Sequence, residues 1–307
     1  MCEVRQPEEN EIVARTVNRR DRRPVLFILI LVILFGASVA VRLPYVGRPL
    51  GAGHEWLTAT VTRNLEVWHQ EGALHDRFLP IMSYPGRANK NIDNQTSHIK
   101  DREGNFYYVS FPAFAYVLPY VVLTASGAAP TLLALQVFNL ILHGVVALLL
   151  YLLVRRVLPA PSAVPALAAA TIYLFTPVTL TYHSNVYMSD ILAQTLFICS
   201  IWAALLWFDE RRKRWVAVAL PIALFCFVLT EWLSLFFGLA IVGYVLAVKR
   251  RRLATLVTVV ASVALALGAT IWQYSQIAGS GTLLRTTIRM YNIRSGAGGE
   301  VSIQAAR

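Results

Sequence analysis

Long apolar stretches alternate with short basic clusters along most of the chain, a pattern typical of proteins that cross a membrane several times. Seven stretches predict membrane helices, and they cover residues 24–43, 130–154, 163–180, 190–208, 215–229, 233–248 and 253–272. The two stretches beside Glu231 are short, but joining them into one helix would place basic clusters on both sides of the membrane. The pattern therefore predicts an all-α, polytopic membrane protein with about seven transmembrane helices.

The basic clusters set the expected orientation, because lysine and arginine gather on the cytoplasmic side of membrane helices. These clusters lie at residues 19–23, 155–156, 211–214 and 249–252. With the clusters inside, residues 1–23 form a cytoplasmic tail, residues 44–129 a long extracytoplasmic loop and residues 273–307 an extracytoplasmic tail. The expected location is the cytoplasmic (inner) membrane, with many passes and a cytoplasmic N-terminus.

One apolar piece of the loop, residues 111–123, is too short for a comfortable span and contains Pro112 and Pro119. If it crossed the membrane, Arg155 and Arg156 would lie outside and every later basic cluster would be inverted. We therefore expect a juxtamembrane or re-entrant helix here.

Composition agrees with a membrane protein, since 56% of the 307 residues are hydrophobic and only 15% are charged. The net charge of +11 would also suit a nucleic-acid partner, but the basic residues lie mostly in short clusters between apolar runs. We interpret these clusters as cytoplasmic helix ends and contacts with anionic membrane lipids, and we expect no nucleic-acid partner.

Residues 51–72 predict an amphipathic helix that opens the extracytoplasmic loop. Its spacing places polar side chains near one face and apolar side chains on another. The polar set is His54, Glu55, Thr58, Thr62 and Glu66, and the apolar set is Trp56, Ala59, Leu65 and Trp68. The section 77–105 that follows is polar and irregular, and it ends in a turn leading into a short extended piece.

Ionisable residues at membrane depth are costly, so those on the outer side are candidates for function. They are His54, Glu55, His183, Asp190, Glu231, Arg285 and Arg289, and the predicted topology brings all of them to the outer face. Each also has an ordinary structural alternative: a charge at a helix N-terminus, an N-cap, an interface residue, a water-facing turn or a lipid headgroup contact.

Three stretches carry a resemblance to a known family: GHEWLTATVTRNLEVWHQEG at 53–72, NFYYVSFPAFAYVLPY at 105–120 and NVYMSDILAQTLF at 185–197. With the seven-span layout, they resemble the GT-C superfamily of membrane glycosyltransferases. This superfamily includes protein O-mannosyltransferases and the bacterial aminoarabinose and lipopolysaccharide-core sugar transferases. The resemblance covers most of residues 24–272 and implies one membrane module over that range.

The resemblance implies transfer of a sugar from a polyprenyl-phosphate donor to a lipid, glycan or protein acceptor by a single displacement with inversion. A base would activate the acceptor hydroxyl. The family usually has Asp-Glu where this chain has His54-Glu55, so Glu55 with His54 is the expected base or metal-ligand site, and Asp190 is a second catalytic candidate. Arg285 and Arg289 would bind the donor phosphate. His183 and Glu231 are further candidates for substrate binding, and a divalent cation, if used, would lie on Glu55 and Asp190.

A non-catalytic scaffold, or a component of a transporter or flippase, is the alternative function. The replacement of the family's Asp by His54 motivates it, as does the absence of an outer domain within this sequence. A transporter often places charged or helix-breaking residues near the bilayer midplane, in a repeated pattern. The predicted spans contain polar Gln136, Asn139, His143 and Gln194 but no midplane carboxylate and no internal repeat, so we prefer the enzyme. The sequence leaves open whether the chain continues in a longer protein.

Overall fold

The computed structural model describes residues 24–51, 55–84, 98–159, 162–185, 187, 189–209, 214–248 and 252–295. His54, one of the predicted catalytic residues, lies outside these ranges. The chain divides into two compact units. Unit 1 consists of Met1–Val46 and Leu140–Ser184, and unit 2 of Gly47–Asn139 and Asn185–Arg307.

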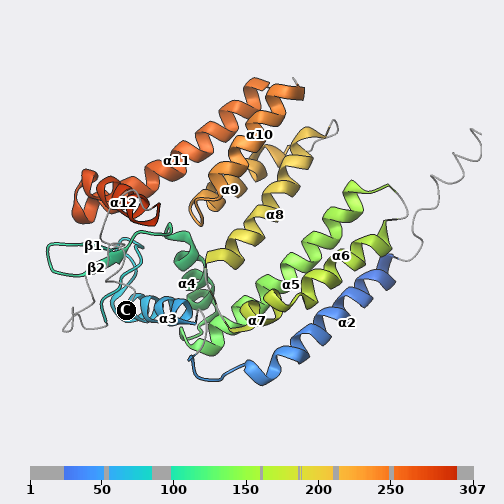
Figure 1. The fold of residues 1–307 in the computed structure, drawn as a ribbon, viewed down its shortest axis with the longest axis horizontal. Coiled ribbons are helices and arrows are strands. Elements are labelled where there is room, and N and C mark those ends of the chain that lie inside the picture. The colour runs from blue at the N-terminus through green and yellow to red at the C-terminus, as the bar shows by residue number, and fades with distance from the viewer. Residues whose placement is uncertain are drawn as a thin grey trace, which may run out of the picture. The chain divides into compact units, whose positions relative to one another are not determined.

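Every apolar stretch that predicts a membrane helix is helical in the structure (Figure 1). The helices are α2 (Pro24–Arg42), α5 (Leu132–Val157), α6 (Ala163–Phe175), α7 (Pro177–Asn185), α8 (Ser189–Phe208), α9 (Val216–Val228), α10 (Ser234–Val248) and α11 (Arg252–Ala278). The helical class of the fold is thereby confirmed.

The number of spans differs from the expectation of about seven. Four helical segments of the described chain are long and apolar enough to cross a membrane: Val25–Tyr45, Leu132–Val157, Ser189–Phe208 and Leu253–Ala278. A fifth results if α6 and the following helix, which are bent by 56° at their junction, count as one span. Helices α9 and α10 have 13 and 15 residues, fewer than the ~20 that a membrane requires. The described residues therefore contain four to five candidate spans.

In unit 1, α2 packs against α6, and the second half of α5 approaches α2 at a glycine. A Cβ atom on Gly144 would meet the ring of Phe35 at 3.0 Å, so the missing side chain permits this close packing.

The junction between α6 and α7 lies at Pro177, and the sequence explains the bend there. Thr176 has an extended backbone (φ −60°, ψ 133°), as expected for a residue that precedes proline. Pro177 has no N–H to donate to the carbonyl of Tyr173, one turn earlier. The hydroxyl of Thr179 donates to that carbonyl instead, at 2.6 Å.

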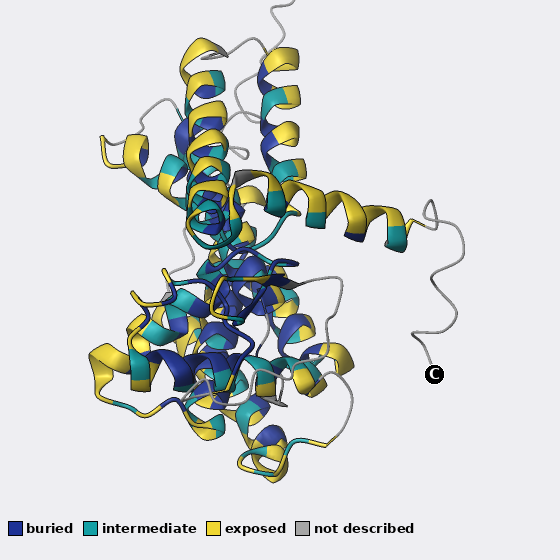
Figure 2. Cartoon of the chain, turned by 90° about the vertical axis from the view of Figure 1, so that its left-hand side faces the viewer, coloured by how far each residue is buried: buried dark blue, intermediate teal, exposed yellow. Residues whose placement is uncertain are grey.

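The core of unit 2 is formed by α8, α9, α10 and α11, which pack through fully buried aliphatic residues such as Leu220, Leu224 and Val245. The indole Nε1–H of Trp207 donates to the hydroxyl of Thr255 at 2.9 Å, so the one polar atom of this large buried side chain has a partner. Many large apolar residues of these helices are exposed, and Figure 2 marks the exposed positions along them, as expected for helices that contact lipid.

The described part of the predicted loop between the first two spans contains regular structure. It contains the short 3₁₀ helix η1 (Leu43–Tyr45), α3 (Trp56–Glu71), α4 (Phe114–Ser126) and an antiparallel hairpin of β1 (His98–Lys100) and β2 (Phe106–Tyr108). The hairpin is the predicted turn and extended piece, and α4 is the predicted short helix with Pro119 inside it. After α11 the chain forms α12 (Ser280–Arg294), which carries Arg285 and Arg289.

The buried face of α3 only partly matches the prediction. Leu65 and Trp68 are fully buried, but Trp56 is 55% exposed. The buried face includes two polar residues because they accept backbone amides from other segments. Thr58 Oγ1 accepts the N–H of Tyr187 at 2.9 Å, and Asn64 Oδ1 accepts the N–H of Ile81 at 2.6 Å.

Candidate functional site

Glu55 is the residue immediately before α3, and only 4% of it is exposed. Its carboxylate accepts the backbone N–H of Gly51 at 2.7 Å and forms an ion pair with Arg48. The same loop is fixed at its start, where the N–H of Gly47 donates to Gln136 Oε1 at 2.8 Å. Glu55 is thus held by the loop that precedes α3, and the positive charge of Arg48 stabilises its ionised form.

Tyr187 joins the start of α3 to the chain entering α8. Its N–H donates to Thr58, one turn after Glu55, and its hydroxyl donates to the carbonyl of Ala115 in α4 at 2.7 Å. Only 1% of Tyr187 is exposed, so both bonds lie in the interior of unit 2. The N-terminal ends of α3, α4 and α8 therefore meet around one tyrosine.

Asp190 and Glu231 form a second acidic group at the start of α8. Asp190 lies in the first turn of that helix, where the helix dipole favours a negative charge. The neighbouring Ser189 hydroxyl donates to one oxygen of Glu231 at 3.3 Å, and the N–H of Trp232 donates to the other at 3.0 Å. Burial, and then the charge of Asp190, raise the pKa of the Glu231 carboxyl above its ordinary value.

The turn that carries Glu231 is tied to the loop before α4. The indole Nε1–H of Trp232 donates to the carbonyl of Ser110 at 2.8 Å, and the N–H of Phe114 donates to the carbonyl of Leu229 at 3.0 Å. Together with the Tyr187 bonds, these contacts connect the elements that carry the three carboxylates Glu55, Asp190 and Glu231. We call these three residues the carboxylate cluster.

The described residues contain no group of three or more His, Cys, Asp or Glu side chains that could hold a metal ion. A cation on Glu55 and Asp190 would therefore lack a complete set of such ligands within the part of the chain that the structure describes.

His183 belongs to a separate polar network inside unit 1, centred on Arg42. Only 1% of Arg42 is exposed. Its Nη1 donates to the carbonyl of Ser38 at 2.7 Å, and its Nη2 donates to the carbonyls of Leu174 and Thr179 at 3.3 and 3.1 Å. The guanidinium therefore binds carbonyls on both sides of the bend between α6 and α7.

Arg42 also fixes the proton positions of the two histidines. Its Nη2 lies 3.0 Å from Nε2 of His143, and a guanidinium can only donate, so neutral His143 carries its proton on Nδ1. That Nδ1 lies 3.1 Å from Nδ1 of His183 and 3.0 Å from the hydroxyl of Tyr173. When His143 donates to His183, the proton of neutral His183 lies on Nε2. We call Arg42, His143, Tyr173 and His183 the arginine network.

The arginine network could not be found from local sequence patterns, because Arg42 lies 101 residues from His143 and 132 from Leu174. One signal was present: an arginine ends the first apolar stretch, and residues 24–46 and 140–184 contain no Asp or Glu to neutralise it.

Arg285 and Arg289 lie on the exposed surface of α12, in the same unit as the carboxylate cluster. Figure 2 shows α12 largely exposed along its length. The structure thus carries Glu55, Asp190 and Glu231 on elements that hydrogen bonds connect, leaves the two arginines on another helix of that unit and places His183 in the arginine network. No family model, curated protein or solved structure matches this chain.

Proposed function

We propose that this protein is an integral-membrane glycosyltransferase with about seven spans. It moves a sugar from a polyprenyl-phosphate donor to a lipid, glycan or protein acceptor. The transfer takes place on the outer face of the cytoplasmic membrane. The observation that carries the proposal is the carboxylate cluster. Three acidic residues from distant stretches lie on elements that Thr58, Tyr187, Ser189 and Trp232 tie together by hydrogen bonds. Seven spans require the short helices α9 and α10 to cross with help from their flanking residues.

In the proposed reaction a carboxylate takes the proton of an acceptor hydroxyl while that oxygen forms a bond to the anomeric carbon. The bond between this carbon and the phosphate oxygen breaks, and the phosphate leaves with the electron pair. Glu231 suits the role of base because its raised pKa brings it closer to neutral pH. Glu55, which Arg48 and Gly51 hold, suits the role of a fixed charge that orients the loop beside the base.

The test is transfer from radiolabelled polyprenyl-phosphate sugars by the purified full chain in detergent. Glu231→Gln should lower turnover by roughly 10²–10⁴-fold, the range of general-base catalysis, with donor binding retained. Asp190→Asn should lower turnover less, because it removes only a neighbouring charge that raises the pKa of Glu231. Glu66→Gln is the matched control because this carboxylate lies on α3 and bonds to the exposed side chain of Gln70. Donor binding and transfer that are equal in all variants would refute the role of the cluster, and the absence of donor binding would refute the function.

The arginine network favours one other function, that of a transporter or flippase component. Broken helices with polar side chains beside the break are characteristic of transport sites, and here α6 and α7 meet at 56° beside Arg42 and His183. Flux of a solute or lipid across proteoliposomes that is lost in His143→Gln, without any sugar transfer in the unchanged protein, would favour this function over the enzyme.

A further inference from the structure

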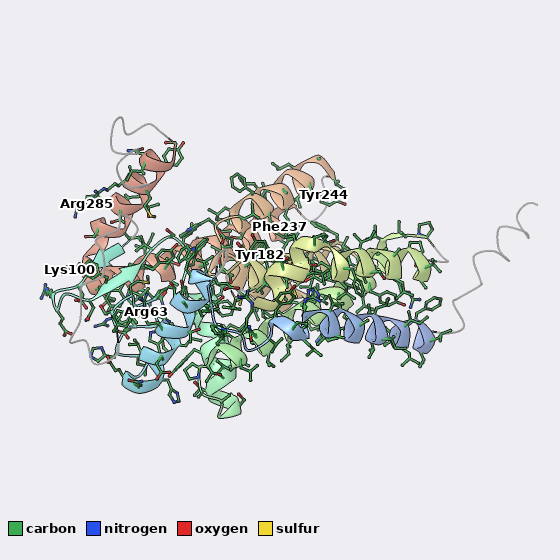
Figure 3. All side chains as sticks on the ribbon, turned by 60° about the horizontal axis from the view of Figure 1, so that its bottom comes forward. Arg63, Lys100, Tyr182, Phe237, Tyr244 and Arg285 are labelled. Carbon is green, nitrogen blue, oxygen red and sulfur yellow. The ribbon has the colours of Figure 1, made fainter. Side chains whose placement is uncertain are left out.

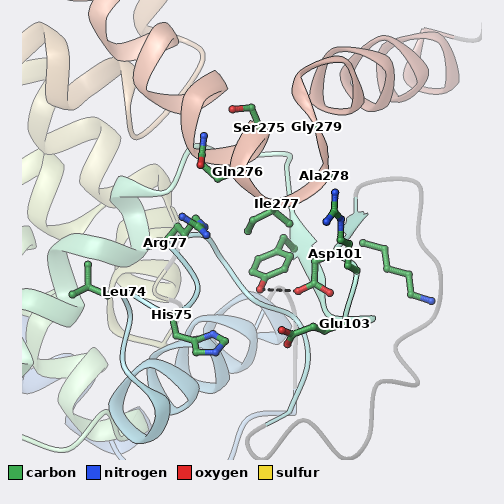
Figure 4. Close-up of a pocket in the computed structure, with 13 residues that line it drawn as sticks. Leu74, His75, Arg77, Asp101, Glu103, Ser275, Gln276, Ile277, Ala278 and Gly279 are labelled. Carbon is green, nitrogen blue, oxygen red and sulfur yellow. Dashed lines mark hydrogen bonds between the residues drawn. The ribbon is translucent and has the colours of Figure 1, made fainter.

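A cavity of about 970 Å³ lies in unit 2, apart from the carboxylate cluster (Figure 4). Its walls come from three segments: residues 74–77 after α3, residues 100–103 at the hairpin turn, and residues 275–279 where α11 ends and α12 begins. This volume is at the upper end of the range for small-molecule sites. All three segments belong to the same compact unit.

Among the ionisable residues that line this cavity, the basic ones outnumber the acidic ones. They are Arg77, Lys100 and Arg102, with the imidazole of His75, against the carboxylates of Asp101 and Glu103. Figure 4 shows His75 and Arg77 on the side opposite the two acids.

Asp101 is engaged within the hairpin. Its carboxylate accepts the backbone and side-chain N–H groups of Asn105 at 2.8 and 2.9 Å and the hydroxyl of Tyr107 at 3.3 Å. These donors hold the Asp101 carboxylate within the turn, where it keeps its negative charge.

The first turn of α12 adds further positive character. Gly279, with a φ of 79°, precedes the helix, and no side chain caps the helix N-terminus. The residues at this junction line the cavity, and the free N–H groups of a helix N-terminus carry a partial positive charge. Arg285 folds back on this turn, since its Nη2 lies 3.9 Å from the position of a Cβ on Gly281. Figure 3 shows Arg285 and Lys100 at the same end of unit 2.

The backbone that presents Arg77 is held in an unusual conformation. Arg77 and Phe78 both have left-handed backbones, with φ of 54° and 57°, which is costly for residues other than glycine. The ring of Phe78 packs edge-on against Trp68 at 6.0 Å and Tyr120 at 6.4 Å, and Gln273 Nε2 donates to the carbonyl of Arg77 at 3.2 Å. The packing of the partly buried ring of Phe78 therefore holds Arg77 in the cavity wall.

We propose that this cavity binds a phosphate-bearing polar headgroup, with the phosphate between Arg77, Lys100 and the first turn of α12. Arginine matches the geometry of phosphate oxygens, and the remaining volume accommodates a saccharide-sized group next to Ser275 and Gln276. The same chemistry is present in a soluble sugar phosphate and in the headgroup of an anionic phospholipid. Binding here does not depend on sugar transfer, so the proposal stands or fails separately from the proposed function.

Calorimetric titration of the full chain in detergent with glucose 6-phosphate tests the site. We expect saturable binding that weakens at least tenfold in Arg77→Asn and in Lys100→Gln and is unchanged in Arg214→Gln, a control for an exposed cation away from the cavity. Asparagine is chosen because it tolerates a left-handed backbone while removing the charge. Lys100→Gln, at an exposed strand position, keeps the test decisive if Arg77→Asn does not fold.

A second arm of the experiment identifies the source of the headgroup. Competition by nanodiscs of phosphatidylglycerol, but not of phosphatidylcholine, would assign the site to a lipid headgroup, whereas no competition by either would assign it to a soluble ligand. The proposal is overturned if neither glucose 6-phosphate nor phosphatidylglycerol binds saturably. It is also overturned if glucose binds as tightly as its phosphate, or if Arg77→Asn and Lys100→Gln bind as the unchanged protein does.

Discussion

The hydroxyl of Thr179 should contribute measurably to stability, although valine would fill nearly the same space. This hydroxyl donates to the carbonyl of Tyr173 at 2.6 Å and lies 2.9 Å from the carbonyl of Thr176. The carbonyl of Tyr173 depends on it because Pro177, at the position of the usual helical donor, has no N–H. Thr179→Val removes the donor and retains the β-branched shape, so the change isolates the hydrogen bond.

The expected size of the effect follows from the burial of Thr179, of which 8% is exposed. Loss of a donor to a buried acceptor costs about 1–3 kcal/mol in water-soluble proteins. Hydrogen bonds between membrane-embedded side chains average about 0.6 kcal/mol and reach about 1.7, because the unfolded chain in the membrane also finds partners. We therefore expect Thr179→Val to lower the free energy of unfolding by about 1 kcal/mol.

Thr171→Val is the matched control. The hydroxyl of Thr171 also donates to a carbonyl four residues earlier, Leu167 O at 2.8 Å, but that carbonyl lies inside α6 and already receives a helical N–H. Its loss should cost less than about 0.5 kcal/mol. Unfolding of the full chain in detergent, followed by far-UV circular dichroism across a denaturant series, measures both values. Equal losses in the two variants would refute the argument that the Pro177 break makes Thr179 special.

Three further predictions concern unit 2 and the α2–α5 contact. The pKa of Glu231 is raised in the folded state, so its ionisation costs stability as pH rises through that value. Glu231→Gln should therefore be more stable than the unchanged protein at neutral pH and lose this advantage below about pH 4. Denaturation midpoints from pH 3 to 8 measure the difference. Arg48→Met should lower the free energy of unfolding by about 1–3 kcal/mol, because it removes the cation that pairs with the buried Glu55 charge. In a double-mutant cycle, adding Glu55→Gln should recover most of this loss. Gly268→Ala should stabilise α11 by roughly 0.5–1 kcal/mol, because a Cβ there meets nothing within 4 Å. Gly144→Ala should not stabilise the protein, because a Cβ there meets an aromatic ring at 3.0 Å. The thermal midpoints of the two variants, each compared with the unchanged protein, measure both effects.

The helices were predictable because the signal for each is local. Apolar runs of the necessary length, ended by basic clusters, fix bounds such as 24–42 and 189–208 within a residue or two. The number of spans was less predictable, since α9 and α10 are apolar enough but short, and their 13 and 15 residues do not reach across a membrane unaided. An apolar pattern predicts that a segment is helical, but it indicates only indirectly whether that helix crosses a membrane.

The residues of the candidate site could be named from the sequence, but their contacts could not. A carboxylate at the outer end of an apolar stretch is conspicuous, which is why Glu55, Asp190 and Glu231 were named from the sequence. The bond from Tyr187 to Thr58 spans 129 residues, and no local pattern indicates it. For the same reason the polar residue Thr58 was assigned correctly to the helix but not to its buried face.

The position of Arg42 at the end of α2 explains how its buried charge is stabilised. Residues 24–46 and 140–184 contain no carboxylate, yet the guanidinium is stabilised because it contacts carbonyl oxygens at Ser38, Leu174 and Thr179. Ser38 and Leu174 lie near the C-terminal ends of α2 and α6, and each such end carries roughly half of a negative elementary charge. As the last residue of α2, Arg42 lies within reach of the carbonyl of Leu174 at the end of α6, so its charge is buried without an acid among residues 24–46 and 140–184.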